Sequence, residues 1–265
     1  MRGFLIVNPR SGDGGADDLV AAARSHGIEV HLLQEGDDPG EIARHAQADA
    51  LGMAGGDGSL GAVAAIAIER DLPFVCVPFG TRNHFARDVG LDRSDPIGSL
   101  AAFTGGSEQR IDVGRAAERL FLNNVSIGVY ARLVHRREHH RRRRDALARL
   151  RGLAILATQR HTARLTVDGA PLEAHVLLIA NNGYDLTVLS IGERARLDEG
   201  LLHLYAEHGL VRPSWEERAA EAFTIDAPGS HLRAAVDGEP VRFETPVEFR
   251  SEPGALRLLL PCPVG

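Results

Sequence analysis

One stretch of this chain has the residue types and spacing needed to hold a phosphate. The sequence AGGDGSLGAVAAIA, residues 54–67, places four glycines and Asp57 in eight positions and then continues into an alanine-rich helix. Such bare backbone is typical of a loop whose N–H groups bind a phosphate at a helix N-terminus. Glycine-rich turns also form simply because glycine tolerates positive φ, so this stretch alone leaves both interpretations open.

Two carboxylates lie beside glycines in stretches that are typical of turns. Asp57 lies inside the glycine-rich loop, and Glu239 follows Asp237-Gly238 in the stretch VDGEP. A carboxylate can accept the proton of a hydroxyl that attacks a phosphoryl group. The simpler interpretations are that Asp57 caps the helix that follows it and that Asp237-Gly238 is a hairpin turn followed by a solvated glutamate.

The basic residues exclude one class of phosphate site. The chain contains no lysine, so all 30 of its basic charges are arginine. A Walker-type phosphate loop requires its lysine, which excludes a P-loop kinase or ATPase. Backbone amides, arginine and a metal ion must therefore hold any nucleotide phosphate.

Strand-like and helix-like segments alternate over the first hundred residues. The patterns predict strands at 3–10, 28–34, 48–56 and 72–80, and helices at 16–27, 39–48, 59–70 and 82–90. This alternation indicates βαβ units and a mainly parallel sheet. The loops 8–15, 55–59 and 78–83 then meet at the carboxyl edge of the sheet, where such folds bind ligands. Their convergence favours the phosphate interpretation.

From about residue 110 the pattern changes to strands separated by turns. The segments 163–182, 200–209 and 231–250 are strand-like, while helical patterns are confined to the arginine-rich segment and to 213–223. We therefore predict an α/β fold: an N-terminal nucleotide-binding α/β domain, 1–110, followed by an antiparallel β-sandwich domain, 111–254. The C-terminal strand, about 255–265, can pack back on the first domain.

Five motifs together resemble the diacylglycerol kinase catalytic family, which includes bacterial lipid kinases and sphingosine kinases. They occur in that family's order over nearly the full chain: NPRSG (8–12), GGDGSLG (55–61), PFGTRNHFARDVGL (78–91), LDEGLLHLY (197–205) and VDGEP (236–240). The resemblance implies a nucleotide-binding α/β domain followed by a β-sandwich. It also implies Mg²⁺-dependent transfer of the ATP γ-phosphoryl group to a lipid hydroxyl, with ATP and Mg²⁺ as cofactors.

The resemblance also implies roles for individual residues. Glu239 matches the proposed general base, and Asp57 its partner in the water and metal network. A structural Mg²⁺ is implied at Glu199, with the backbone oxygens of Arg196 and Leu201 as further donors. The implied nucleotide-binding residues are Asn8, Ser11, Gly12, Gly55, Gly56, Asp57, Gly58, Ser59, Leu60, Gly61, Thr81 and Asn83.

Some positions depart from the family pattern. His84 replaces an aspartate, and a histidine cannot act as a carboxylate ligand at neutral pH. Glu199 stands where aspartate is usual, and its extra methylene matters because Mg²⁺ is strict about geometry. Leu32 replaces a threonine that contacts the nucleotide. These changes suit either a subfamily with another acceptor or weakened catalysis.

Residues 132–151 carry a concentrated positive charge. The segment contains nine arginines and only two acidic residues, Glu138 and Asp145, so its charge is +7. Because the net charge of the chain is −6, the rest of the chain carries −13. Such a segment can dock on an anionic membrane that presents the lipid substrate, and we expect its arginines to face that surface: Arg141, Arg142, Arg143 and Arg144. A solvated, charged helix is the simpler alternative.

The expected setting is cytoplasmic and peripheral to the inner face of the membrane. The apolar run Phe4–Val7 is too short for a signal peptide, nothing approaches a transmembrane span, and Cys76 and Cys262 suggest buried thiols in a reducing compartment. No aromatic residues interleave the arginines, so we expect no nucleic-acid partner. A homodimer stays open.

Two other functions stay open at this point. GGDGSLGA is also similar to the nucleotide loop of phosphofructokinases, and NAD kinases carry a related GGDG, so the acceptor could be soluble. The departures at His84 and Glu199 would also suit a catalytically weak, nucleotide-binding membrane adaptor.

Overall fold

The computed structural model describes residues 1–12, 14–80, 83–128, 163–187, 190–191, 193–207 and 215–262. The chain divides into two compact units. The first comprises Met1–Val113 with Pro253–Gly265, and the second comprises Gly114–Glu252. The domain limits expected from the sequence, 1–110 and 111–254, remain predictions about independently organised domains.

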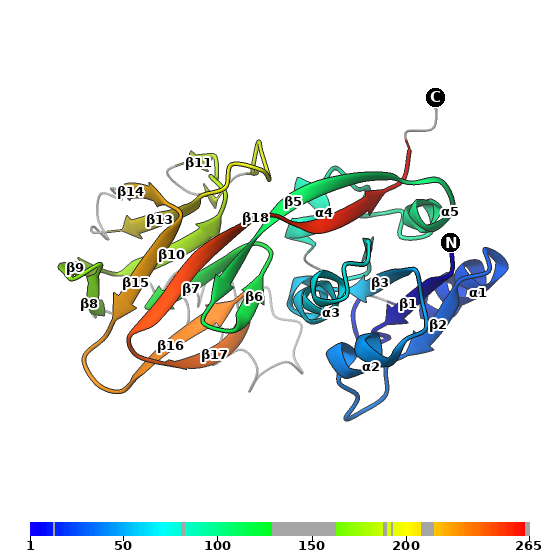
Figure 1. The fold of residues 1–265 in the computed structure, drawn as a ribbon, viewed down its shortest axis with the longest axis horizontal. Coiled ribbons are helices and arrows are strands. Elements are labelled where there is room, and N and C mark those ends of the chain that lie inside the picture. Colours follow the sequence, from blue (N-terminus) through cyan, green and yellow to red (C-terminus); the bar gives the residue numbers. More distant parts are fainter. Residues whose placement is uncertain are drawn as a thin grey trace. The chain divides into compact units, whose positions relative to one another are not determined.

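The first unit alternates strands and helices, as Figure 1 shows. Its strands are predominantly apolar and buried, which is typical of a sheet covered on both faces. The elements are β1 (Gly3–Val7), α1 (Ala16–Ser25), β2 (Glu29–Leu32), α2 (Pro39–His45), β3 (Ala50–Gly55), α3 (Asp57–Glu69), β4 (Phe74–Pro78), α4 (His84–Asp88), the 3₁₀ helix η1 (Gly98–Ala101), α5 (Ala102–Gly105) and the start of β5 (Ser107–Ala116).

The strands of this unit form a parallel sheet in the order β2-β1-β3-β4. Leu5 and Val7 of β1 share a buried core with Leu19 of α1 and Phe103 of α5. Figure 1 shows α2 and α3 on the other side of these strands from α1. The residues that follow β1, β3 and β4 therefore emerge at the same edge of the sheet.

One long strand joins the first unit to the second. β18 (Val247–Leu260) pairs in parallel with β4 through Leu258 and Leu259, and antiparallel with β15 through Val247–Arg250. It also pairs with β5. The side chain of Asp112 on β5 accepts a hydrogen bond of 2.8 Å from the N–H of Gly254, which ties the two strands together.

Strands of two β-sheets share a common core in the second unit, and β11 and β12 pair separately. The antiparallel sheet β14-β13-β10-β7-β16-β17 shares its buried side chains with strands β15, β8 and β9. Val125 and Phe249, for example, belong to the same apolar cluster. The remaining elements are β6 (Arg119–Phe121), β7 (Asn124–Gly128), β8 (Ala163–Val167), β9 (Ala170–Ala174), β10 (Val176–Asn181), β11 (Leu186–Thr187), β12 (Ser190–Ile191), β13 (Leu202–Glu207), β14 (Trp215–Ala220), β15 (Ala222–Asp226), β16 (His231–Val236) and β17 (Glu239–Glu244).

The predicted fold class is confirmed, since a mainly parallel α/β sheet is followed by packed antiparallel sheets. The predicted helix at 213–223 is wrong. Residues 215–220 pair with β13, and 222–225 pair with β18. Ala, Glu and Arg favour a helix locally, but these strand pairings outweigh that weak preference.

The expectation for the cysteines holds only in part. Cys76 on β4 is buried, and burial together with the charge of Asp57 raises the pKa of its thiol. Cys262 is exposed because it follows the last strand of the sheet. Among the described residues, no helix combines the length and the apolar character needed to cross a membrane.

Candidate functional site

Three turns follow the parallel strands β1, β3 and β4. In the first turn, Asn8 donates its N–H to the carbonyl of Ala54 on β3 at 2.9 Å. Its side-chain oxygen accepts from the N–H of Arg10 at 3.0 Å, and its carbonyl accepts from Ser11 at 3.1 Å. Gly12 has φ +83°, a conformation that favours glycine. These bonds hold the turn tightly against β3.

The second turn passes directly from β3 into the N-terminus of α3. Gly55 ends the strand, Gly56 caps the helix and Asp57 is its first residue, two positions before the predicted start. Ser59 donates its hydroxyl to the carbonyl of Gly56 at 2.8 Å. A side chain at Gly55 would collide with that hydroxyl, so the turn requires glycine there. The first N–H groups of a helix have no partners within the helix and point out of its N-terminus.

Asp57 joins the second turn to the third. Its side chain is buried, with 8% of the residue exposed. One oxygen accepts from the N–H of His84 at 3.0 Å and the other from the N–H of Phe85 at 3.1 Å. The carboxylate therefore caps α4 rather than the helix that contains it.

The third turn packs closely on the second. A Cβ at Gly80 would lie 3.0 Å from the Cα of Gly56. Asn83 is buried and donates its side-chain amide to the carbonyl of Gly80 at 2.9 Å. The structure thus brings together most of the predicted nucleotide-binding residues at one edge of the sheet. Thr81 lies outside the described residues.

Glu239 lies in the second unit and is exposed as the first residue of β17. Asp237 and Gly238 form the two-residue turn before it, with φ 46° and 86°. Positive φ at both central residues is typical of a hairpin turn, so the hairpin interpretation is correct. The Asp237 carboxylate also accepts from three successive N–H groups, those of Leu122, Asn123 and Asn124, at 2.8–3.0 Å.

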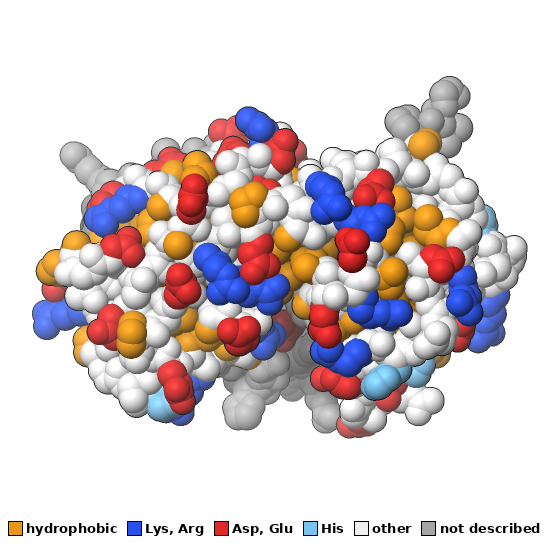
Figure 2. Space-filling model, in the orientation of Figure 1, with side chains coloured by type: hydrophobic (Ala, Val, Ile, Leu, Met, Phe, Trp, Pro, Cys, Tyr) orange, Lys and Arg blue, Asp and Glu red, His pale blue; other side chains and the backbone are white. Residues whose placement is uncertain are grey.

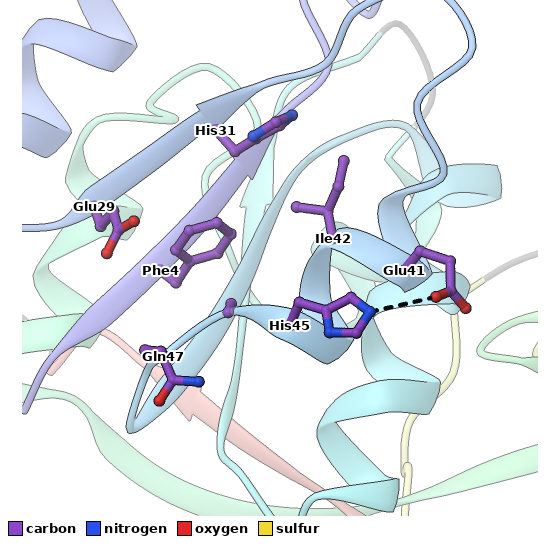
Figure 3. Close-up of a pocket in the computed structure, with 8 residues that line it drawn as sticks. Phe4, Glu29, His31, Glu41, Ile42, His45 and Gln47 are labelled. Carbon is purple, nitrogen blue, oxygen red and sulfur yellow. Dashed lines mark ion pairs between the residues drawn. The ribbon is translucent and has the colours of Figure 1, made fainter.

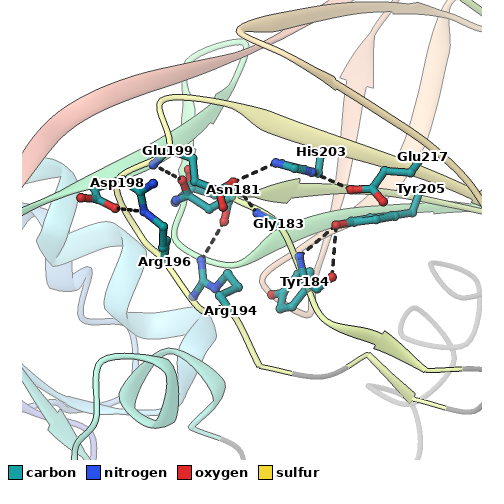
Figure 4. Close-up of polar contacts among 11 residues, drawn as sticks. Asn181, Gly183, Tyr184, Arg194, Arg196, Asp198, Glu199, His203, Tyr205 and Glu217 are labelled. Carbon is teal, nitrogen blue, oxygen red and sulfur yellow. Dashed lines mark hydrogen bonds and ion pairs between the residues drawn. The ribbon is translucent and has the colours of Figure 1, made fainter.

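The predicted metal-binding residues lie in the segment before β13 (Figure 4). The Glu199 Oε2 atom accepts from the N–H of Gly183 at 3.0 Å and lies 2.9 Å from Nε2 of His203. The carbonyl of Leu201 accepts from the N–H of Asn182 at 3.1 Å. Arg196 donates its side chain to Asp198 at 3.0 Å, and this contact lowers the pKa of Asp198. Among the described residues, no three His, Cys, Asp or Glu side chains converge as a metal site.

Sequence reasoning missed a buried arginine beside this segment. Arg194 is 4% exposed and donates to the carbonyls of Leu122 and Asn181 at 2.6 and 3.0 Å. It also donates to Asn123 Oδ1 at 2.9 Å and lies over the Tyr184 ring. In the sequence GERARLDEG it looks like one of several solvated charges, so no local signal identifies it.

An open hollow lies elsewhere on the first unit. It is lined by residues of β1, β2 and α2 and of the turn after α2, with Phe4 at its base and His31 and His45 at its sides (Figure 3). Neither the glycine-rich turn nor Asp57 lines it. None of the motifs identified in the sequence lies in this hollow.

The predicted membrane-facing arginines, Arg141–Arg144, lie outside the described residues. On the face drawn in Figure 2, the described basic and acidic side chains are interspersed. The described part of that face therefore adds no basic area of its own to the expected membrane contact.

Comparison with known proteins finds that this chain is similar to proteins that carry one kinase name. Residues 2–116 match the family described as the diacylglycerol kinase catalytic domain. Over 297 aligned residues the chain is 26% identical to a protein named diacylglycerol kinase from Mycobacterium tuberculosis (strain H37Rv), covering 97% of this chain and 94% of the relative. The same values hold for the protein of strain CDC 1551 / Oshkosh.

Solved structures share the fold over nearly the whole chain. A diacylglycerol kinase from Bacillus anthracis str. Sterne matches with a TM-score of 0.68 at 17% identity, covering 98% of this chain and 96% of that one. A second structure from that organism, provisionally named for the same activity, matches with a TM-score of 0.72 at 19% identity and the same coverage. The resemblance derived from the sequence motifs is confirmed.

Proposed function

We propose that this chain is a lipid kinase, because residues 2–116 match the family described as the diacylglycerol kinase catalytic domain. It transfers the γ-phosphoryl group of ATP to the hydroxyl of a diacylglycerol-like lipid. The observation that carries the proposal is the glycine-lined edge of the parallel sheet, where β3 turns directly into the N-terminus of α3. Relatives that match nearly the full chain carry the name of this activity.

The turns at this edge fit the phosphate groups of a nucleotide. Side chains are absent at Gly55, Gly56, Gly58 and Gly80, so a ligand can approach the backbone closely. The N-terminus of α3 carries a partial positive charge that favours an anion. Ser59 holds this turn in shape through Gly56, and Asn8 and Ser11 shape the turn beside it. Mg²⁺ bound with ATP would supply positive charge that offsets the charge of the phosphates at this edge.

Asp57 positions the nucleotide-binding turns in this proposal. By accepting the N–H groups of His84 and Phe85, it fixes the start of α4 against the start of α3. A carboxylate has about four lone-pair sites, so Asp57 can also accept from water at the nucleotide. The replacement of an aspartate by histidine at position 84 does not disturb this cap, because the bond uses the backbone N–H.

Glu239 is the proposed general base. Its carboxylate accepts the proton of the lipid hydroxyl while the hydroxyl oxygen forms a bond to the γ-phosphorus and ADP leaves. The turn at Asp237-Gly238, anchored to the backbone of Leu122–Asn124, sets the position of Glu239. Positioning and electrostatic stabilisation supply most of the rate enhancement in such a transfer.

The proposal also covers the lipid acceptor and the membrane surface in which it lies. The lipid acceptor resides in an anionic membrane surface, and the arginines at 141–144 attract the cytoplasmic protein to that surface. No nucleic acid takes part, and a homodimer is compatible with the proposal.

The experiment uses ATP with a radiolabelled γ-phosphate, Mg²⁺ and vesicles made from a bacterial lipid extract. We expect label in the organic phase with the wild-type protein, little label with Glu239→Gln and full labelling with the control Glu244→Gln. Glu244 is exposed and lies on the same hairpin. Label confined to the aqueous phase when a soluble extract is added would favour a soluble acceptor, as in phosphofructokinases. ATP binding without any turnover would favour an adaptor.

A further inference from the structure

The donor set at Glu199 does not suit the structural divalent cation that the family resemblance implies there. The Glu199 Oε2 atom already accepts from the N–H of Gly183 and contacts His203. The carbonyl of Leu201, a second implied donor, accepts from the N–H of Asn182. Mg²⁺ demands near-octahedral geometry and keeps several waters, so an ion here would compete with bonds that the protein makes to itself.

The space beside Glu199 Oε2, on the side of Gly183, is also occupied. The backbone of Gly183 passes so close that a Cβ there would lie 3.1 Å from the ring of His203 and 3.5 Å from Glu199 Oε2. The residues before and after, Asn182 and Tyr184, are buried. A hydrated ion therefore has no room on this side of the carboxylate.

His203 lies between two carboxylates (Figure 4). Its Nε2 is 2.9 Å from Oε2 of Glu199, and its Nδ1 is 2.8 Å from Oε1 of Glu217 on the neighbouring strand. Each ring nitrogen thus lies within hydrogen-bond distance of a different carboxylate, so the imidazole bridges Glu199 and Glu217. The side chain of His203 is 14% exposed, so the protein surrounds most of the ring.

The ring of His203 is held in place from the sheet side. It stacks on the ring of Tyr205, two residues further along β13, with 6.1 Å between the centroids. The Tyr205 hydroxyl in turn accepts from the N–H of Tyr184 at 2.9 Å, and burial raises the pKa of that hydroxyl. The imidazole position is thus defined by packing as well as by its two hydrogen bonds.

We propose that the side chain of His203 takes the place of the divalent cation, so that the loop at Glu199 is fastened without a metal. The loop has three attachments that the protein itself makes. Glu199 contacts His203 on β13, accepts from the N–H of Gly183, and donates its own N–H to Asn182 Oδ1 at 2.9 Å, the last two in the segment that follows β10. Together they do what a bridging ion would do. Mg²⁺ is then required by the kinase only as the partner of ATP.

The first test measures metal binding by the full chain without nucleotide, and it does not depend on kinase activity. Mn²⁺, followed by electron paramagnetic resonance, serves as the probe. We expect no submillimolar site that is lost in Glu199→Gln. One equivalent of Mn²⁺ that binds the wild type and Glu217→Gln, and is lost in Glu199→Gln, would overturn the proposal. Glu217→Gln is the matched control because its carboxylate also contacts His203 but was never implied as a metal ligand.

The second test follows hydrogen exchange at the N–H of Gly183, which donates to Glu199. In the wild type we expect the same exchange rate in EDTA and in millimolar MgCl₂. In His203→Ala we expect exchange to rise roughly tenfold in both conditions, because Glu199 loses its partner. Slower exchange of the wild type in MgCl₂ than in EDTA would contradict the proposal, even if the His203→Ala variant failed to fold.

Discussion

The carboxylate of Asp57, at the N-terminus of α3, accepts the backbone N–H of His84 at 3.0 Å, at the N-terminus of α4. This bond, together with that from Phe85, fixes two helix N-termini relative to each other at the glycine-lined edge of the sheet. Asp57 belongs to the glycine-rich motif that the sequence predicts to bind phosphate, yet its carboxylate holds the neighbouring turn in place. The proposed nucleotide site depends on this link, because both turns border the same edge.

Replacing Asp57 with asparagine should weaken the link. The asparagine NH₂ group can only donate, so at least one of the two N–H groups loses its acceptor. Leaving a buried donor unsatisfied costs about 1–3 kcal/mol. We expect the free energy of unfolding in urea to fall by that amount and exchange at His84 and Phe85 to accelerate. The control Asp17→Asn changes an exposed aspartate of α1 and should alter neither quantity. Unchanged exchange in Asp57→Asn would contradict this role.

Gly55→Ala should disturb the turn between β3 and α3. The new methyl group collides with the Ser59 hydroxyl, which is bonded to Gly56. Overpacking of this kind costs about 1–3 kcal/mol. ATP affinity, measured by calorimetry, should fall together with stability. Gly105→Ala is the matched control because nothing lies within 4 Å of a Cβ at that position. Equal ATP affinity in the two variants would count against a phosphate site at Gly55.

Asp237→Asn should uncouple the hairpin that carries Glu239. Asparagine tolerates the positive φ of this position, but its amide cannot accept all three N–H groups of Leu122–Asn124. We expect a loss of about 2 kcal/mol of stability and a lower kcat with little change in the KM for ATP. Asp168→Asn is the control, since Asp168 lies in a similar Asp-Gly turn and, among the described residues, accepts the single N–H of Thr224. A kcat that falls equally in both variants would refute the specific role of Asp237.

Acid should remove the contribution of Glu252 to stability. Burial raises the pKa of this carboxyl, but bidentate hydrogen bonds from Arg115 at 2.8 and 3.0 Å and the charges of Arg115 and Arg250 outweigh burial and lower it overall. Because the pKa is lower in the folded state, the ionised carboxylate stabilises the protein at pH values above the unfolded pKa of 4.5. This stabilisation is lost as the pH falls through the folded-state pKa. The pair is partly exposed, so we expect Glu252→Gln to cost about 1 kcal/mol at pH near 7.

Denaturant unfolding of the wild type and Glu252→Gln from neutral pH to about pH 3 checks this prediction. The difference in the free energy of unfolding between the two proteins should become smaller at pH values below the unfolded pKa of 4.5. Glu248→Gln, an exposed change on the same strand, is the control. A difference that stays constant with pH would show that the effect is not electrostatic.

The arginine-rich segment should determine binding to anionic vesicles. Changing Arg141–Arg144 to glutamine removes four charges, each worth about 1 kcal/mol near such a surface. Flotation with anionic vesicles should therefore fail for this variant and should persist when the same residues are changed to lysine. Undiminished flotation of the glutamine variant would rule out this segment as the membrane contact.

The sequence predicted most of the first unit, because its elements carry regular hydrophobic periods and clear turn residues. The helix predicted at 213–223 is wrong because Ala, Glu and Arg favour a helix only locally. Pairing with the strands β13 and β18, which are formed by other parts of the chain, determines the structure of this segment. Asp57 was correctly identified as important, but its partner could not be known. A cap on a helix 27 residues away depends on how two turns pack.

The contacts of Glu199 were beyond sequence reasoning for the same reason. His203 is four residues away along the chain, but Glu217 belongs to another strand, and Gly183 precedes both. Arg194 similarly finds its partners at Leu122, Asn123 and Asn181. Buried polar contacts of this kind arise from tertiary pairing and leave no periodic pattern in the sequence.

Transfer of label from γ-labelled ATP to purified diacylglycerol in anionic vesicles measures the proposed lipid kinase activity itself. We expect labelled lipid with the wild type and with Glu244→Gln, and a kcat lower by a factor of about 10²–10⁴ with Glu239→Gln. No labelled lipid with the wild type would rule out this activity, and equal kcat values for Glu239→Gln and Glu244→Gln would rule out Glu239 as the general base.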